Sequence, residues 1–198
     1  MSLEMVGAEV TRGDLSSILL PSFDQIPLRA RSPPIIKFDH REHAGTVMPT
    51  GSTTIKFRLS KAQISSLKSR SSITGDAIKP SSFCAVTSLI WKCYCHARGL
   101  APETTTHLMI TMDVRGRLNP PLPKHHFSNA IVQKCLQSKV SKITSNSLHA
   151  VAKYVKAAVD SVNDEYVRSF IDYIEIARND VLMRSTAVYE SHLELLAF

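Results

Sequence analysis

The chain has 198 residues, 43% of them hydrophobic and 21% charged, a balance ordinary for a globular protein that buries a core. Its 24 Lys and Arg against 17 Asp and Glu give a net charge of +7, which admits an anionic partner. No apolar run is long enough to span a membrane, and residues 1–10 carry no early basic cluster. We therefore expect a cytoplasmic protein with no membrane association and no secretory signal.

The basic residues are spread along the sequence, which is typical of a solvated surface. We expect no nucleic-acid partner, although a basic binder whose affinity falls steeply with salt remains an alternative. Three of the four cysteines, Cys84, Cys93 and Cys95, fall in one expected helix, and Cys135 lies elsewhere. Residues two apart on a helix diverge, and no second Cys or His pair lies at zinc spacing, so we expect buried free thiols and no metal site.

The first elements follow a proline-punctuated segment, residues 1–52, that shows little sustained periodicity and reads as connection. Ile55, Phe57 and Leu59 then alternate with basic residues, which predicts a half-buried strand. A helix is expected to begin after Ser60, because Ser60 and Gln63 fit a capping box in which each side chain satisfies a backbone N–H of the first turn.

A second helix is expected from Ser81 or Ser82 to Arg98, with Gly99 just past its end. Its apolar residues cover a broad face, which indicates burial against a sheet or other helices. We expect that face to centre on Phe83, Val86, Ile90, Cys93 and Ala97, widened by Ala85, Leu89 and Trp91.

Strands and helices alternate over the rest of the chain. A strand is expected over Leu108–Val114, with Leu108, Ile110, Met112 and Val114 on one side, and another near Ala130–Val132. Helical periodicity returns at residues 147–162, where Leu148, Val151, Val155, Val159 and Val162 form a stripe. Asn163 is placed to cap a last helix that carries Tyr166, Phe170, Ile171 and Ile174 inward. This order favours a layered α/β fold.

The residues alone point to no catalytic group. There is no Gly-x-Ser-x-Gly nucleophile elbow and no glycine-rich phosphate loop. His40 and His43 flank Glu42 in a short polar stretch, and His125 and His126 follow each other in a proline-rich segment. Adjacent or loop-borne histidines of this kind are more typical of a loop surface than of a metal or catalytic site.

Residues 113–123 carry the most specific pattern, Asp-Val-Arg-Gly-Arg-Leu-Asn-Pro-Pro-Leu-Pro, followed by Phe127-Ser128-Asn129. This order resembles the Asp-Gly-Arg-x-Arg-Leu-x-Pro-Pro-Leu-Pro-x-x-Tyr-Phe-Gly-Asn segment of plant BAHD acyltransferases, particularly the hydroxycinnamoyl-CoA:shikimate/quinate branch. Further matching segments are Glu9–Asp14, Leu28–Pro34, Phe57–Ile64, Ile90–Leu100 and Glu165–Tyr173. The resemblance extends from about Val6 to Tyr189.

The resemblance implies part of a two-domain fold of chloramphenicol-acetyltransferase type, an α/β arrangement with a mixed sheet and flanking helices. Residues 1–52 would be the end of the N-terminal domain with the crossover segment, and residues 53–198 an incomplete C-terminal acyltransferase domain. The family's His-x-x-x-Asp and Asp-Phe-Gly-Trp-Gly motifs are both absent. We therefore expect a chain truncated at both ends, with no catalytic residue of its own and apolar faces left uncovered, most of all on the helix over residues 147–162.

What the resemblance carries over is the side of the site that holds acyl-CoA, the co-substrate; no bound cofactor is implied. The acceptor would be a small hydroxylated compound whose carboxylate meets Arg184. The acyl-CoA residues implied are Ser81, Ser82, Phe83, Met112, Asp113, Val114, Arg115, Gly116, Arg117 and Leu118.

Two of these assignments have plain alternatives. The serines would serve equally as helix caps, and Arg115 and Arg117 would serve equally as donors to loop carbonyls. Val114, His126 and Ser128 depart from the family pattern, which places Gly, Tyr and Gly there. The alternative function is a non-catalytic module that binds CoA or another protein.

Overall fold

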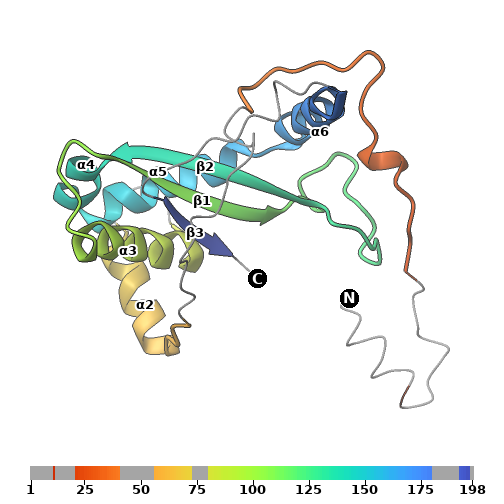
Figure 1. Ribbon diagram of the computed structural model, residues 1–198. Coiled ribbons are helices and arrows are strands. Elements are labelled where there is room, and N and C mark those ends of the chain that lie inside the picture. The colour runs from red at the N-terminus through yellow and green to blue at the C-terminus, as the bar shows by residue number, and fades with distance from the viewer. Residues whose placement is uncertain (1–10, 12–20, 41–55, 73–79, 180–191, 197–198) are drawn as a thin grey trace.

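The computed structural model describes residue 11 and residues 21–40, 56–72, 80–179 and 192–196 (Figure 1). Both helices and strands occur along these ranges, as a layered α/β fold requires. The elements are η1 (Ile26–Leu28), α2 (Lys61–Arg70), α3 (Ser82–Ala97), β1 (Thr105–Asp113), β2 (Ile131–Lys139), α4 (Val140–Ser145), α5 (Leu148–Ser161), α6 (Asp164–Asn179) and β3 (His192–Leu196).

A mixed sheet lies at the centre, in the order β2-β1-β3. β1 and β2 are antiparallel, and their register runs from the pair Thr105↔Lys139 to the pair Asp113↔Ile131. β3 is parallel to β1, so the sheet has the mixed character expected. The long loop over residues 114–130 joins β1 to β2 at one end of the sheet, while β2 passes directly into α4 at the other end (Figure 1).

The two strands that were expected here are longer than their sequence signals. β1 begins at Thr105, and β2 extends to Lys139 although its signal covers only residues 130–132. Gln133, Lys134 and Ser138 interrupt the apolar alternation of β2, but the ladder with β1 includes all three. Cross-strand pairing thus overrides the local pattern.

The stretch at residues 56–59 is not a strand, contrary to expectation. It has no secondary structure, and Phe57 is 70% exposed. In the described part of the chain no neighbouring strand pairs with it, so the alternation has no ladder to join; the expected strand's start, residues 53–55, lies outside the described residues. The helix that follows is confirmed, with the Ser60–Gln63 capping box intact.

Helix α3 has the expected ends but a different buried face. Ser81 caps it, and Gly99 adopts the expected left-handed conformation with φ +56°. The buried side chains include Cys84, Ser88, Trp91 and Cys95, whereas Cys93 and Ala97 are exposed. Trp91 sets this rotation, because its indole Nε1 donates to Thr106 Oγ1 at 3.1 Å and turns that side of the helix toward the sheet.

The valine stripe on α5 is buried. The expectation that this helix leaves an apolar face uncovered is therefore wrong. Val155 and Val162 are 0% exposed and Val151 is 3% exposed. They belong to one core cluster with Trp91 of α3 and Leu108 of β1. At about 25 cal/mol per Å² of apolar surface removed from water, this shared core is the main stabilising contribution to the α3–α5–sheet assembly.

Helix α6 begins as expected, because Asn163 Oδ1 accepts from the backbone N–H of Tyr166 at 3.0 Å. Tyr166 is buried, but Ile174 is 44% exposed, so its expected inward position is wrong. The inward positions of α6 instead include two polar residues, Ser169 and Asp172, both 0% exposed. Segment 28–40 packs against this face of α6, as the hydrogen bonds described below show.

Candidate functional site

The loop over residues 114–130, which carries the most specific motif, folds back on itself. Val114 N–H donates to Ala130 O at 3.0 Å, and Arg117 N–H donates to Val114 O at 2.9 Å. Leu122 N–H donates to Arg115 O at 2.9 Å. Val114, Leu118 and Leu122 are buried in the core, so the loop is rooted at both ends and through its middle.

Arg117 fastens this loop to the end of helix α5. Its guanidinium Nη1 donates to the carbonyls of Val159 and Val162, each at 2.8 Å. Val159 O lies in the last turn of α5 and also accepts the backbone N–H of Val162 at 3.4 Å, and Val162 is the residue that caps the helix end. Asn119 N–H also donates to Asp164 Oδ1 at 2.8 Å, in the first turn of α6. The loop is therefore bound to the α5–α6 junction through a charged side chain.

Arg115 is held at the surface. Its Nη2 donates to Ser128 O, and its Nη1 lies 3.1 Å from Asp113 Oδ1. The Asp113 side chain is 61% exposed, and it also accepts from the backbone N–H of Arg115 at 2.9 Å. Exposed ion pairs of this kind contribute little net free energy, because water competes for both charges.

The second expected group, Ser81–Phe83, forms the N-terminal end of α3. Ser81 Oγ accepts from the backbone N–H of Cys84 at 3.2 Å, so this serine does cap the helix. The contact between Trp91 and Thr106 places the C-terminal half of α3 beside the start of β1. Since helix and strand run in opposite directions, the Ser81 end of α3 and the 114–130 loop lie toward the same end of the sheet (Figure 1).

Two histidines that were expected at a loop surface are buried instead. His40 is 1% exposed, and its Nε2 lies 2.9 Å from Ser169 Oγ. Its ring packs at 4.8 Å from that of Tyr166, measured between centroids. Burial, with help from the charge of Lys134 and against that of Asp39, lowers the pKa of His40 to about 4.

His126 of the proline loop is 5% exposed, and its Nε2 lies 2.7 Å from Ser128 Oγ. A surface position is expected for His40 from its polar stretch, and for His126 from its place beside His125 in a proline-rich loop. Their burial arises from partners that the local pattern does not reveal. His43 and Arg184 lie outside the described residues.

A buried carboxylate on α6, which the sequence pattern did not single out, holds the segment that resembles the family's Leu-Arg-Ala-Arg-x-Pro-Pro. Asp172 accepts from Arg31 N–H at 2.7 Å, from Arg31 Nε at 2.6 Å and from Ile35 N–H at 2.8 Å. Burial alone would raise the pKa of Asp172, but the hydrogen bonds from Ile35 and Arg31 and the charge of Arg31 outweigh it, and the pKa is lowered. The available signal was an acidic residue on the inward stripe of an amphipathic helix.

The four cysteines are free thiols, and they differ in burial. Cys84, Cys95 and Cys135 are buried free thiols as expected, whereas Cys93 is exposed. Burial raises the pKa of the Cys95 thiol. No cluster of three or more His, Cys, Asp or Glu able to hold a metal occurs within the described ranges. In the same ranges, no helix is both long and apolar enough to cross a membrane.

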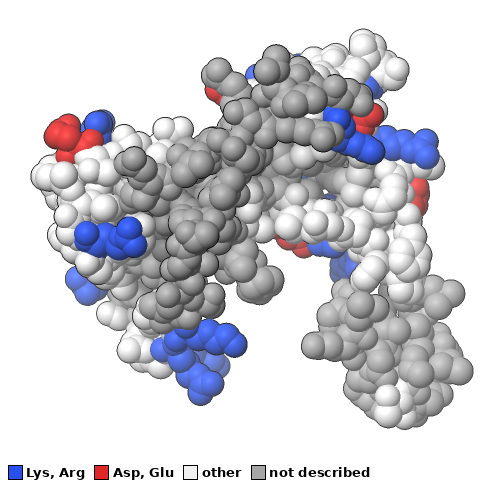
Figure 2. Space-filling view, in the orientation of Figure 1, with Lys and Arg blue, Asp and Glu red and all other residues white. Residues whose placement is uncertain are grey.

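Charge on the face seen in Figure 2 is distributed in separate groups. Lys and Arg side chains appear over the α2–α4 side and again near α6, with acidic side chains among them (Figure 2). Among the described residues on that face, the basic side chains form separate groups and not one continuous stripe. Such separate groups are typical of a solvated charged surface.

The sheet with its flanking helices, and the motif-bearing loop beside it, define the class of protein. The model of the Transferase family matches residues 6–194, so the chain belongs to this family, which comprises the BAHD acyltransferases. The resemblance inferred from the loop motif is thereby confirmed.

Hydroxycinnamoyltransferases are among the relatives that the chain matches. Over 169 residues the chain is 40% identical to putrescine hydroxycinnamoyltransferase 1 of Oryza sativa subsp. japonica, with 81% of this chain and 37% of the relative covered. It is 31% identical over 183 residues to shikimate O-hydroxycinnamoyltransferase of Nicotiana tabacum, with 85% and 42% covered. The chain thus spans about two fifths of the length of the curated relatives it matches.

The fold is also that of solved members. The structure of F. graminearum TRI101 complexed with coenzyme A and T-2 mycotoxin matches with a TM-score of 0.69 at 16% identity, covering 97% of this chain and 48% of that one. The F. sporotrichioides TRI101 complex with coenzyme A and T-2 matches with a TM-score of 0.55 at 18% identity, covering 67% and 32%. The expected acyltransferase fold class is confirmed by this likeness.

Proposed function

We propose that this chain contributes the acyl-CoA-holding part of a hydroxycinnamoyltransferase, a cytoplasmic enzyme that moves a hydroxycinnamoyl group from acyl-CoA to a hydroxyl group of shikimate, quinate or a similar acceptor. The family match over residues 6–194 is the observation that carries the proposal. The proposal assigns residues 1–52 to the crossover from an N-terminal domain and residues 53–198 to the C-terminal acyltransferase domain. Arg184 meets the acceptor's carboxylate.

The proposed reaction is acyl transfer through a tetrahedral intermediate. A histidine of the His-x-x-x-Asp motif would take the proton from the acceptor hydroxyl, whose oxygen then attacks the thioester carbonyl and expels the CoA thiolate. That motif is absent from these 198 residues. We therefore propose that the chain by itself binds acyl-CoA without turning it over.

The two arginines of this loop have different roles in the proposal: one holds the loop in place and the other contacts CoA. Arg117 uses Nη1 for the α5 carbonyls, so its main role in the proposal is to fix the loop over residues 112–118. Arg115 is the better candidate for a CoA phosphate, because its partner Asp113 is a solvent-exposed carboxylate. A phosphate can displace such a weakly held partner and receive a bidentate guanidinium contact.

Calorimetric titration of the chain with CoA tests this assignment. Arg115→Gln should weaken binding by about tenfold, the effect of losing one charge-assisted contact. The matched control is Arg70→Gln, an exposed arginine on the last turn of α2, which should leave binding unchanged. Equal weakening by both variants would mean that the loss comes from the change in net charge, and that Arg115 does not contact CoA.

Turnover is measured separately, with p-coumaroyl-CoA and shikimate. We expect no ester above the uncatalysed background from the chain alone. Ester formation that depends on the protein would overturn the proposed inactivity while leaving the family and the CoA site in place.

The absence of the family's base from the sequence favours a second candidate, a non-catalytic module that binds CoA or another protein. Tight CoA binding without turnover agrees with either candidate. Mixing the chain with a full-length relative distinguishes the two candidates. A protein-binding module should change the relative's activity or sediment together with it. If it does neither, the protein-binding form of the second candidate fails.

A further inference from the structure

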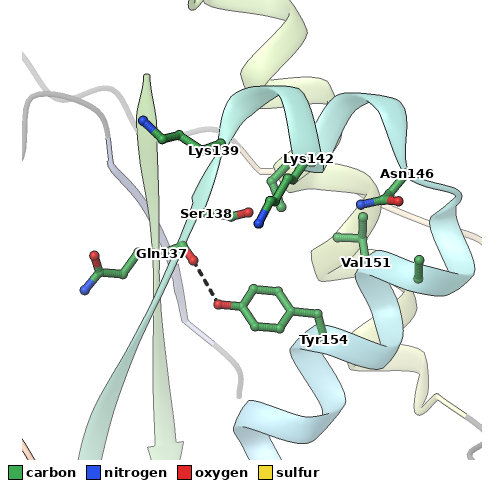
Figure 3. Close-up of a pocket in the computed structure, with 9 residues that line it drawn as sticks. Gln137, Ser138, Lys139, Lys142, Asn146, Val151 and Tyr154 are labelled. Carbon is green, nitrogen blue, oxygen red and sulfur yellow. Dashed lines mark hydrogen bonds between the residues drawn. The ribbon is translucent and has the colours of Figure 1, made fainter. Parts of the chain in front are cut away.

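A cavity of about 310 Å³ opens at the end of the sheet opposite the 114–130 loop. It lies where β2 passes into α4 and where the first half of α5 packs beside them (Figure 3). None of its lining residues belongs to the groups proposed to meet acyl-CoA. The lining residues are Gln137, Ser138, Lys139, Lys142, Ile143, Asn146, Ala150, Val151 and Tyr154.

The polar part of the lining has a single sign of charge. Two lysines line the cavity and no acidic residue does. Lys139 turns away, where its Nζ donates to Glu103 O at 2.6 Å (Figure 3). Lys142 extends toward Ser138, and Asn146 points to the same space from the opposite side (Figure 3). Among the described residues, none of the side chains of Ser138, Lys142 and Asn146 has a hydrogen-bond partner or a charge partner.

The remaining wall is apolar and held in place. Ile143, Ala150 and Val151 line it together with the ring of Tyr154. The Tyr154 hydroxyl donates to Gln137 O at 2.9 Å, and the ring stacks on Trp91 with a centroid distance of 6.2 Å. The cavity therefore has an aromatic wall whose orientation is fixed before any ligand arrives.

The rim is also held, by a half-buried lysine of α3. Lys92 Nζ of α3 donates to Ile143 O at 2.7 Å, Thr144 O at 2.9 Å and Asn146 O at 2.6 Å. These bonds satisfy the last carbonyls of the short helix α4 and fix the turn that carries Asn146. They also leave a second positive charge behind the cavity, which adds to the field of Lys142.

We propose that this cavity binds a small organic anion, a carboxylate with a compact apolar body, at a site separate from the acyl-CoA site. The carboxylate meets Lys142 Nζ, Ser138 Oγ and the Asn146 side-chain amide, and the apolar body lies against Val151 and the Tyr154 ring. A few converging polar groups beside an apolar wall are the usual composition of a small-molecule site. The ammonium supplies a charge-assisted hydrogen bond to the carboxylate.

Benzoate is the probe, and benzamide, which has the same shape without the charge, is its neutral control. Titration of the ¹⁵N-labelled full chain with sodium benzoate should shift backbone amide signals within residues 137–154. Benzamide should bind at least about tenfold more weakly, because it offers no charge to Lys142.

Two variants locate the site. Lys142→Met should weaken benzoate binding about tenfold, whereas the matched control Lys61→Met, an exposed lysine of α2 that does not line the cavity, should not. Ala150→Leu should abolish binding of both probes by filling the cavity while keeping every charge. Lys142 is exposed, so its replacement should leave the fold intact, which circular dichroism checks.

Several outcomes would overturn the proposal. Absence of saturable shifts up to the solubility of benzoate is one, and equal affinity for benzoate and benzamide is another. Equal loss in Lys142→Met and Lys61→Met would mean that net charge alone attracts the anion. Shifts that map to residues 112–118 would mean that the anion occupies the proposed acyl-CoA loop instead.

Discussion

Two arginine–aspartate pairs occupy opposite situations in this molecule. Arg31 meets Asp172, whose side chain is 1% exposed, and that carboxylate also accepts two backbone N–H groups. Arg115 meets Asp113, whose side chain is 61% exposed. The chemical groups are the same, so the difference lies in the surroundings. A buried carboxylate with several donors holds chain segments together, whereas an exposed one leaves its arginine open to exchange partners.

The largest expected effect comes from removing the buried carboxylate. Asp172→Ala leaves the N–H groups of Arg31 and Ile35 and the Arg31 guanidinium without their acceptor, and it should lower the free energy of unfolding by about 4 kcal/mol. Urea denaturation measures it. A loss below about 1 kcal/mol would mean that segment 28–40 is held by other contacts.

The pH dependence of stability is expected to follow His40. Its folded-state pKa of about 4 lies below the ordinary histidine value of 6.5, so the fold favours the neutral ring. That contribution is fully present above pH 6.5 and is lost as the pH falls from about 6.5 toward about 4, on the order of 3 kcal/mol in all.

Stability measured at several pH values in His40→Gln tests this expectation. The variant keeps a hydrogen-bonding group for Ser169 but cannot titrate. Its stability should be flat over that window. Asp172 also contributes to the pH dependence, because its pKa is lowered from the ordinary value of 3.8. Its stabilising contribution is lost only as the pH falls below 3.8, so it can be separated from that of His40. An unchanged slope in His40→Gln would assign the acid sensitivity elsewhere.

A middle-sized effect is expected at Arg117. Arg117→Met keeps much of the aliphatic stem but removes the two bonds to the α5 carbonyls, and it should cost about 2 kcal/mol. Hydrogen exchange should quicken at the α5–α6 junction before it does in β1. If exchange instead quickens evenly throughout the chain, Arg117 does not act locally on the loop.

The smallest effect is expected from the exposed pair. Asp113→Ala should change the free energy of unfolding by no more than about 0.5 kcal/mol. It should nonetheless strengthen CoA binding, since Arg115 then loses its competing carboxylate. Weaker CoA binding in this variant would contradict the proposed exchange of Asp113 for phosphate.

Local signals in the sequence located the helices well. Ser60 with Gln63, Ser81, Ser147 and Asn163 each cap the helix that they were expected to cap or begin. Caps are predictable because the donor and acceptor lie within three residues of each other. The family motif likewise identified the fold, because a loop sequence of that length rarely recurs by chance.

The parts that escaped prediction depend on residues far apart in the sequence. Asp172 meets Arg31 across 141 positions, and Ser169 meets His40 across 129. Nothing near His40 signals that an aromatic group on α6 will cover it. The strand expected at residues 56–59 failed for the same reason, since a strand requires a neighbour that its own pattern cannot supply. The proposed anion cavity is built from β2, α4 and α5 and carries no motif at all.

Trp91 is the only tryptophan in the chain, and it is 0% exposed. Its indole is hydrogen-bonded to β1 through Thr106 and stacked on Tyr154 of α5. The tryptophan fluorescence of the protein therefore originates at one point where three elements meet. Loosening of either contact should move the emission to longer wavelength. The fluorescence of Trp91 therefore reports whether the core around it is packed.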